Sequence, residues 1–305
     1  MFRLIAVDID GTLLRSDKTV SPRTRDALRT ARDQGAVLML ASGRPEHGLR
    51  HLAETLGLGL ERLVLASCNG AAVVDAETEE IICHRTLDPA LVARVLDLVE
   101  ELGLAAMTPL GHVVHATRED GYNVSAEAPA NGMELAITPR FEDLGEPLHK
   151  VLVCAEPALL ARHVETFRRE LHGQAELALS APFYLEITPP GVDKGSGLLD
   201  YCAARDLDPA EAAAFGDNEN DLPMLRAAGT GVAMGNALDH VKDGADRVTA
   251  SNDDDGIAVV LEEHFASTSC PPCVASGRPA SSWRSRTRTA RTSPTRSTSC
   301  RSATT

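Results

Sequence analysis

The chain has 305 residues, 43% of them hydrophobic and 24% charged, and its formal net charge at pH 7 is −14. This length allows one large or two moderate domains with buried cores. The acidic balance excludes a general surface for nucleic acid or anionic membranes. No apolar run approaches the ~18 residues of a membrane-spanning helix. Seven scattered cysteines and the lack of a recognisable signal peptide indicate a reducing, cytoplasmic setting.

The first 84 residues alternate predicted strands with predicted helices. Ser21 and Pro22 are a typical helix start, and Gly35 a typical end. A polar stretch between two short apolar runs predicts a hairpin at the end of this part. Strands are predicted over 2–7, 36–41, 63–67, 71–74 and 81–84, with helices over 21–35 and 45–56.

The part of the chain from residue 189 to residue 265 returns to this alternation. Alternating strands and helices predict a parallel sheet with helices on both faces. Helices are predicted over 194–204, 222–228 and up to Phe265, with strands over 212–215, 231–234 and 247–249.

Residues 85–188 break the rhythm and predict a separate α+β unit. The chain would enter it after Cys83 and leave it at Pro189-Pro190-Gly191. We therefore predict a Rossmann-like, doubly wound parallel sheet core over 1–84 and 189–265, with an inserted α+β cap domain over 85–188. Inside the cap, helices are predicted over 88–102 and 157–171, and strands over 104–107, 112–116, 149–154, 176–180 and 184–188.

Residues 266–305 differ in composition from the rest of the chain. They hold seven arginines, no lysine and no acidic residue, and are rich in serine and threonine. Such a segment cannot bury enough apolar area to order itself, so we predict a disordered basic tail. The abrupt shift in composition indicates an aberrant extension from a frame error in the coding sequence. A nucleic-acid-binding arm and a redox pair at Cys270 and Cys273 are the alternatives.

The most informative stretch runs from Asp8 to Leu13, directly after a buried strand. Asp8 and Asp10 can face one pocket because side chains alternate along extended backbone. Two crowded carboxylates repel unless a cation or a shared proton relieves them. The pair therefore predicts a Mg²⁺ site with a nucleophilic carboxylate.

Further polar clusters follow other predicted core strands. Ligands of open parallel sheets bind at the carboxyl ends of the strands, so these clusters should meet at one edge. Taken alone, each cluster also has a purely structural explanation. Ser42 could cap a helix, and Lys194 could be a solvated side chain. The clusters comprise Ser42, Asn69, Lys194 and the segment Gly216–Asp221.

This set of residues fits phosphoryl transfer, which demands positioning and charge neutralisation. Asp8 is expected to attack phosphorus, and Asp10 to protonate the leaving oxygen and then deprotonate water. Mg²⁺ is expected on the Asp8 carboxylate, the Asp10 backbone carbonyl and the Asp217 carboxylate, with Asp221 orienting these ligands from behind. The residues expected to hold the phosphoryl oxygens are Ile9, Ser42, Gly43, Lys194 and Asn220.

The motifs resemble those of the haloacid dehalogenase-like superfamily, and within it the Cof-type phosphatases. The resemblance implies Mg²⁺-dependent hydrolysis of small phosphate esters, such as sugar phosphates or phosphorylated cofactors, by a phosphoric monoester hydrolase. It covers residues 1–265, with matching residues at Asp8–Leu13, Ala41–Arg44, Asn69–Ala71, Asp193–Gly195, Gly216–Asp221, Met234–Ala237 and 252–256.

Two alternatives remain beside the phosphatase. A phosphomutase of the same superfamily also uses both aspartates and a similar cap. A non-catalytic protein that binds phosphorylated metabolites would show binding without turnover. The expected partner is a small phosphorylated metabolite, with no nucleic acid and no membrane. The identity of the ester, the cap residues that select it and the oligomeric state are not predicted.

Overall fold

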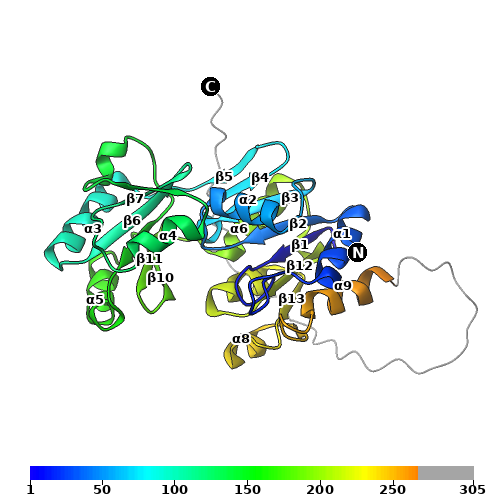
Figure 1. Cartoon of the computed structure of the whole chain (residues 1–305). Helices are drawn as coiled ribbons and strands as arrows, with labels where there is room; N and C mark the ends of the chain where they lie inside the picture. Colours follow the sequence, from blue (N-terminus) through cyan, green and yellow to red (C-terminus); the bar gives the residue numbers. More distant parts are fainter. Residues whose placement is uncertain (267–305) are drawn as a thin grey trace, which may run out of the picture.

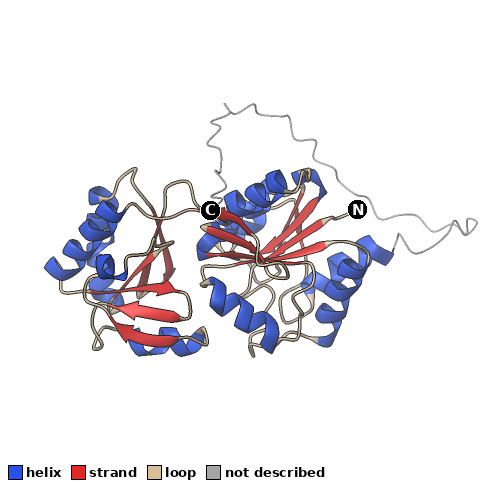
Figure 2. Cartoon of the chain, turned by 90° about the horizontal axis from the view of Figure 1, so that it is seen from above, coloured by secondary structure: helices blue, strands red, loops and turns tan. Residues whose placement is uncertain are grey.

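The computed structural model describes residues 1–266 of the chain. They form two units that lie side by side, each built on its own sheet (Figures 1 and 2). We call the unit with the eight-stranded sheet the core and the unit with the six-stranded sheet the cap. The predicted fold class is confirmed, whereas the exact domain boundaries stay a prediction. From residue 267 onward, the predicted basic tail lies outside the described residues.

The core sheet has the strand order β14-β13-β12-β1-β2-β3-β4-β5. Its first six strands in this order are parallel, and β1 lies between β2 and β12. The last two strands are an antiparallel hairpin added to the edge. The strands are β1 (Leu4–Val7), β2 (Val37–Ala41), β3 (Leu63–Ser67), β4 (Ala72–Asp75), β5 (Ile81–His84), β12 (Ala212–Gly216), β13 (Thr230–Ala233) and β14 (Arg247–Val248).

Helices cover both faces of the core sheet, because its strands are apolar on both sides. Ile5 and Val7 of β1 pack into one apolar layer, and Leu4 and Ala6 pack into the opposite one. The first layer holds α1 (Pro22–Asp33), α2 (Glu46–Thr55) and α9 (Gly256–Ala266), and the second holds α6 (Lys194–Ala204), α7 (Leu222–Ala227) and α8 (Asp239–Gly244).

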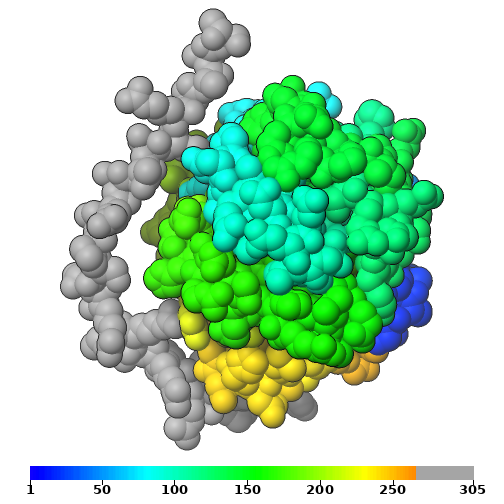
Figure 3. All heavy atoms as spheres, turned by 90° about the vertical axis from the view of Figure 1, so that its left-hand side faces the viewer, coloured from blue at the N-terminus to red at the C-terminus, as the bar shows by residue number. Residues whose placement is uncertain are grey.

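The cap sheet has the strand order β10-β11-β9-β6-β7-β8 and is mostly antiparallel. Two long helices, α3 (Pro89–Glu101) and α5 (Pro157–Glu170), cover one face, and the short α4 (Val124–Ala130) packs on the other. Cap atoms fill most of the face seen in Figure 3. The strands are β6 (Ala105–Leu110), β7 (Val113–Ala116), β8 (Glu134–Ile137), β9 (Val151–Cys154), β10 (Glu176–Ala181) and β11 (Tyr184–Thr188).

Among the α-helices and strands of the described residues, three have no counterpart in the predicted pattern: α4, β8 and α8. Helix α4 begins after Asn123, whose φ is +60°, and contains Pro129. Both features are typical of turns, and tertiary packing of Val124 and Ala128 outweighs them. Strand β8 and helix α8 are short, so their periodicity is weak.

Within residues 1–266, no helix combines the length and the apolar character needed to cross a membrane.

Candidate active site

The carboxyl ends of the core strands and the open face of the cap enclose a cavity of about 610 Å³. Its core side brings together most of the side chains predicted from the strand ends. Its cap side is formed largely by the face that carries α4, with Arg168 of α5 also on the wall. The predicted residues on the cavity wall are Asp8, Asp10, Ser42, Gly43, Lys194 and Asn220, joined by Asn69. The cap contributes Glu127, Asn131, Lys150, Leu152, Tyr184 and Glu186, among others.

Three carboxylates gather around one ammonium group beside this cavity, and Asp8 and Lys194 of this group form part of its wall. Oxygen atoms of Asp8, Asp217 and Asp221 lie within 4.8 Å of one another. The Lys194 Nζ donates to Asp8 Oδ1 at 2.5 Å and to Asp221 Oδ1 at 2.6 Å. Lys194 is 1% exposed, and Asp221 is fully buried.

Burial shapes the charges of this cluster. Desolvation, with the charge of Asp221, raises the pKa of Asp8 to about 8. Desolvation also raises the pKa of Asp217, although the Thr12 hydroxyl opposes the shift by donating a hydrogen bond at 2.6 Å. For Lys194, burial alone would lower the pKa, but the charges of Asp8 and Asp221 raise it above its usual range. The folded site therefore disfavours the charged forms of Asp8 and Asp217 and favours the charged form of Lys194.

This donor set fits a hard divalent cation, which prefers carboxylate oxygens. Asp8 and Asp217 can offer oxygen atoms to such an ion. Both Asp221 oxygens are already used, one by Lys194 and the other by the backbone amides of Asp217 and Asn218 at 2.9 and 3.0 Å. Asp221 therefore fixes the loop that carries Asp217, and its role behind the metal ligands stays a prediction.

The Asp10 carboxylate is not one of the three in this cluster. It forms ion pairs with Arg44 and Lys18, both at 3.0 Å, and its side chain is 47% exposed. Partial burial opposes ionisation, but Arg44 and Lys18 lower the pKa of Asp10. Arg44 also donates to the backbone carbonyl of Ala130 in the cap at 3.3 Å. Asp10 is thus a carboxylate with access to the cavity.

Two turns bring backbone close to the carboxylates. Gly11 has a φ of +87°, and a Cβ there would meet Asp217 Oδ2 at 2.4 Å, so only glycine fits. After β3, Cys68 and Asn69 both have a positive φ, 49° and 57°. Their amides donate to the carbonyls of Arg44 and Ser42 at 2.9 Å. Backbone held in a sparsely populated region is common at functional sites.

The remaining predicted residues are placed as follows. The Ser42 hydroxyl accepts a hydrogen bond from the Arg44 amide at 3.2 Å. Asn220 Nδ2 donates to Asn69 Oδ1 at 3.5 Å. The side chain of Ile9 is fully buried in the core, so that only its backbone can contribute to a site.

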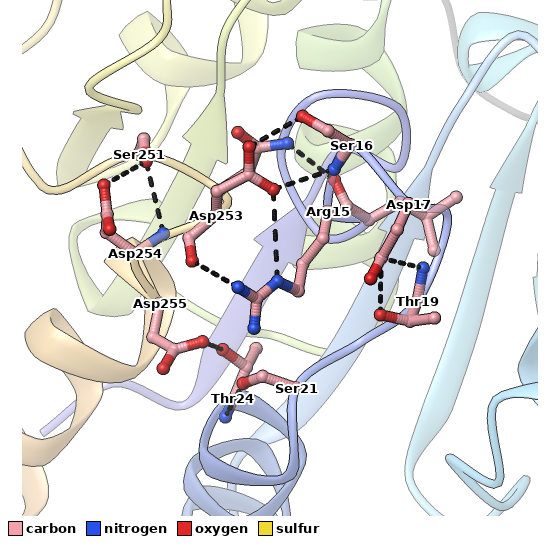
Figure 4. Close-up of polar contacts among 12 residues, drawn as sticks. Arg15, Ser16, Asp17, Thr19, Ser21, Thr24, Ser251, Asp253, Asp254 and Asp255 are labelled. Carbon is pink, nitrogen blue, oxygen red and sulfur yellow. Dashed lines mark hydrogen bonds and ion pairs between the residues drawn. The ribbon is translucent and has the colours of Figure 1, made fainter.

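The loop that follows Asp10 is held by a second set of polar contacts (Figure 4). Asp253 accepts from the Ser16 amide at 2.9 Å and from its hydroxyl at 2.7 Å, and its own carbonyl accepts from Arg15 at 2.8 Å. Asn252 Nδ2 donates to the carbonyl of Leu14 at 2.8 Å. The segment before α9 therefore fixes the turn that carries the Asp8–Asp10 pair.

Two buried charged residues of the cap are part of the cavity wall and were not predicted. Lys150 precedes β9, and Glu186 lies in the middle of β11. A signal for them exists in the sequence. Lys150 stands directly before an apolar strand and Glu186 lies within one, and buried charges of this kind are rare unless they are paired.

Comparisons with known proteins identify the family of the chain. The sequence model of the haloacid dehalogenase-like hydrolases matches residues 5–261. The chain is 30% identical to the 5-amino-6-(5-phospho-D-ribitylamino)uracil phosphatase YitU of Bacillus subtilis, over 86% of this chain and 97% of that protein. It is 31% identical to the pyridoxal phosphate phosphatase YbhA of Escherichia coli, over 86% and 98%.

Solved structures give the same relationship. A haloacid dehalogenase-like hydrolase from Bacteroides thetaiotaomicron superposes with a TM-score of 0.81 at 33% identity, covering 87% of this chain and all of that one. The family model, the relatives and the fold thus indicate the same family. The chain belongs to the haloacid dehalogenase-like hydrolases of the Cof type and is a phosphoric monoester hydrolase.

Proposed function

We propose that this enzyme hydrolyses small phosphate monoesters in a Mg²⁺-dependent reaction that passes through an aspartyl-phosphate on Asp8. The observation that carries the proposal is the position of Asp8. It lies on the cavity wall, and the buried ammonium of Lys194 holds one of its oxygens. A carboxylate oriented in this way can present its other oxygen to phosphorus.

The proposed reaction has two displacements. In the first, an Asp8 oxygen forms a bond to phosphorus while the bond to the leaving oxygen breaks, and Asp10 gives that oxygen a proton. In the second, Asp10 takes a proton from water, which attacks phosphorus and releases Asp8 and inorganic phosphate. Ile9, Ser42, Gly43, Lys194 and Asn220 hold the phosphoryl oxygens throughout.

Substitution of Asp10 tests its part in both steps. We expect Asp10→Asn to lower kcat by about 10²–10⁴-fold, because general acid–base help is lost at each displacement. The measurement is steady-state release of phosphate. Asp239→Asn, at an exposed position of α8, is the matched control and should keep wild-type kcat. A kcat of Asp10→Asn within a factor of about two of the wild type would exclude this role.

Mg²⁺ would be held by the Asp8 carboxylate, the Asp10 backbone carbonyl and the Asp217 carboxylate. Bound there, it would favour the charged forms of Asp8 and Asp217 and neutralise charge on the phosphoryl group. Asp221, which is fully buried, would keep the loop of Asp217 in place.

Removal of the metal is expected to abolish turnover and to lower thermal stability. EDTA should stop phosphate release, and added MgCl₂ should restore it. At a Mg²⁺ concentration of about 100 Kd, binding should stabilise the fold by about 2.7 kcal/mol, which is measured as a rise in Tm. Asp217→Asn should lose most of this rise. Full activity in EDTA, or an undiminished Mg²⁺-dependent rise in that variant, would contradict the metal assignment.

The substrate is proposed to be a small phosphorylated metabolite, enclosed when the cap, residues 85–188, closes over the cavity. Among the described residues on its wall, the cap contributes two cations, Lys150 and Arg168. Lys150 is paired with Glu186, and Arg168 with Glu165. A phosphomutase must bind a second phosphate group, and these paired cations make a weak site for it. Hydrolysis is therefore favoured over transfer between two hydroxyls.

The deciding experiment is a screen of phosphorylated metabolites with MgCl₂ and without a bisphosphate activator. Release of inorganic phosphate with Michaelis–Menten dependence on one of them supports the phosphatase. Isomerisation that needs a bisphosphate supports a mutase. Saturable binding with no turnover of any compound would support a non-catalytic protein and overturn the proposal.

A further inference from the structure

Lys150 and Glu186 of the cap form an ion pair that is buried against the core. The Lys150 Nζ lies 3.3 Å from Glu186 Oε1, and the two side chains are 3% and 6% exposed. Strand alternation directs them there. Leu152 is two positions from Lys150, and Tyr184 is two positions from Glu186. Both lie on the face of the cap sheet that carries α4. The pair thus faces the core and not the interior of the cap.

Each member of the pair also contacts a different loop of the core. The Lys150 Nζ donates to the backbone carbonyl of Gly43 at 2.8 Å. The Asn69 Nδ2 donates to Glu186 Oε2 at 2.6 Å. Gly43 leaves room for this approach, since a Cβ there would lie 3.0 Å from Glu186 Oε1 and crowd the carboxylate. Two cap charges therefore reach the two turns that follow β2 and β3.

Asn69 also contacts a third loop of the core, the one that carries Asn220. Its Oδ1 accepts from Asn220 Nδ2 at 3.5 Å, while its own backbone is held at a φ of +57°. A left-handed conformation of this kind persists only where several contacts enforce it. The hydrogen bond to Glu186 is one of these contacts, and it comes from the other unit. The cap therefore shares in fixing the backbone around Gly43, Asn69 and Asn220.

Energetics favour a role in closure over a role in stability. A buried ion pair is weak support for a fold, because losing hydration offsets much of its attraction. Here the pair would regain water whenever the cap separates from the core, so its contacts with Gly43 and Asn69 can form and break with that motion. Burial lowers the pKa of Lys150, but the charge of Glu186 outweighs this and raises it, so Lys150 stays an ammonium when buried.

We infer that Lys150 and Glu186 are positioning residues, which set the loops of Gly43, Asn69 and Asn220 for phosphoryl binding when the cap closes. The inference rests on the proposed function, because it assigns a purpose to loops that the proposal uses. It requires no contact between either side chain and the substrate. The loops that bind the phosphoryl group would thereby reach their binding arrangement only when the cap closes.

The test uses Glu186→Gln and Lys150→Met in the full chain. The controls are Arg94→Met and Glu170→Gln, which alter a cap ion pair of 3.0 Å that is far more exposed, 44% and 32%. With para-nitrophenyl phosphate and MgCl₂, each test variant should lose about 10–100-fold in kcat, as a displaced reacting group does. The double variant should lose about as much as either single one, because the pair acts as a unit. The controls should keep wild-type kcat.

A second measurement does not depend on turnover. Hydrogen–deuterium exchange of the peptides covering 42–45 and 68–71 should be faster in both test variants than in the wild type, and unchanged in the controls. Unchanged exchange in a folded Glu186→Gln variant would overturn the inference, whatever happens to kcat. Equal losses in the controls would overturn it as well. If Lys150→Met does not fold, Glu186→Gln decides alone. If the wild type cleaves no ester, the proposed function is contradicted. The exchange measurement then tests the inference on Lys150 and Glu186 by itself.

Discussion

Replacing Asp8 by asparagine is expected to lower phosphate release by more than about 10⁴-fold, a loss typical for removal of a catalytic nucleophile. An amide has the shape of the carboxylate but cannot form the acyl-phosphate bond. The measurement is single-turnover and steady-state phosphate release with MgCl₂ and the best ester of the screen. Because burial already disfavours the charged form of Asp8, with its pKa raised to about 8, the neutral asparagine should not lower Tm strongly.

Asp26→Asn is the matched control for this substitution. Asp26 lies on the exposed side of α1, where it pairs with Arg29. We expect this variant to have wild-type activity and a Tm within about 2 °C of the wild type, as is usual for surface changes. If Asp8→Asn retained more than about one hundredth of the wild-type kcat, a mechanism through an aspartyl-phosphate would be wrong.

Replacing Lys194 by methionine is expected to destabilise the fold by about 3–5 kcal/mol, because it leaves buried carboxylates without their cation. Asp8 and Asp221 would both lose the ammonium that now bridges them at 2.5 and 2.6 Å. For a chain of this size the loss corresponds to a drop in Tm of about 10 °C. Turnover should also collapse, since the oxygen of Asp8 is no longer held and a phosphoryl contact is gone.

The unfolding experiment should be done in EDTA, because a bound divalent cation would partly replace the missing charge. Lys242→Met, at a loosely paired position on α8, is the control and should change stability by less than about 0.5 kcal/mol. The double variant Lys194→Met with Asp221→Asn should regain part of the lost stability, because one unpaired charge is removed. An unchanged Tm for Lys194→Met would show that the cluster carries less charge than described above.

Much of the core was predictable because its signals are local. Apolar strands such as Leu63–Ser67 and the Ser21–Pro22 helix start agree with the structure to within a residue or two. The rule that ligands collect at the carboxyl ends of parallel strands then brought distant motifs to one edge. Asp8, Ser42, Lys194 and Asn220 do lie on the wall of one cavity.

The cap side of the cavity was not predictable in the same way, because it depends on how two units meet. Lys150 contacts a carbonyl 107 positions away in the chain, and no local pattern encodes that distance. The partners of Asp10 are a related case. Arg44 was noted only as part of a motif, and Lys18 not at all, yet both lie 3.0 Å from its carboxylate. Side-chain pairing of this kind follows from tertiary packing alone.

The position of β1 between β2 and β12 has a consequence for the order in which the enzyme is made. Strand β2 is synthesised soon after β1, but β12 begins only at Ala212, after the whole cap. The entropic cost of closing the chain between β1 and β12 grows by only about 0.6 kcal/mol for each doubling of its length. A cap that folds first as a contiguous unit shortens this loop further. On the ribosome, the part of the sheet with Asp8 therefore has one open edge until β12 is made, and the cluster of Asp8, Asp217 and Asp221 can form only after that.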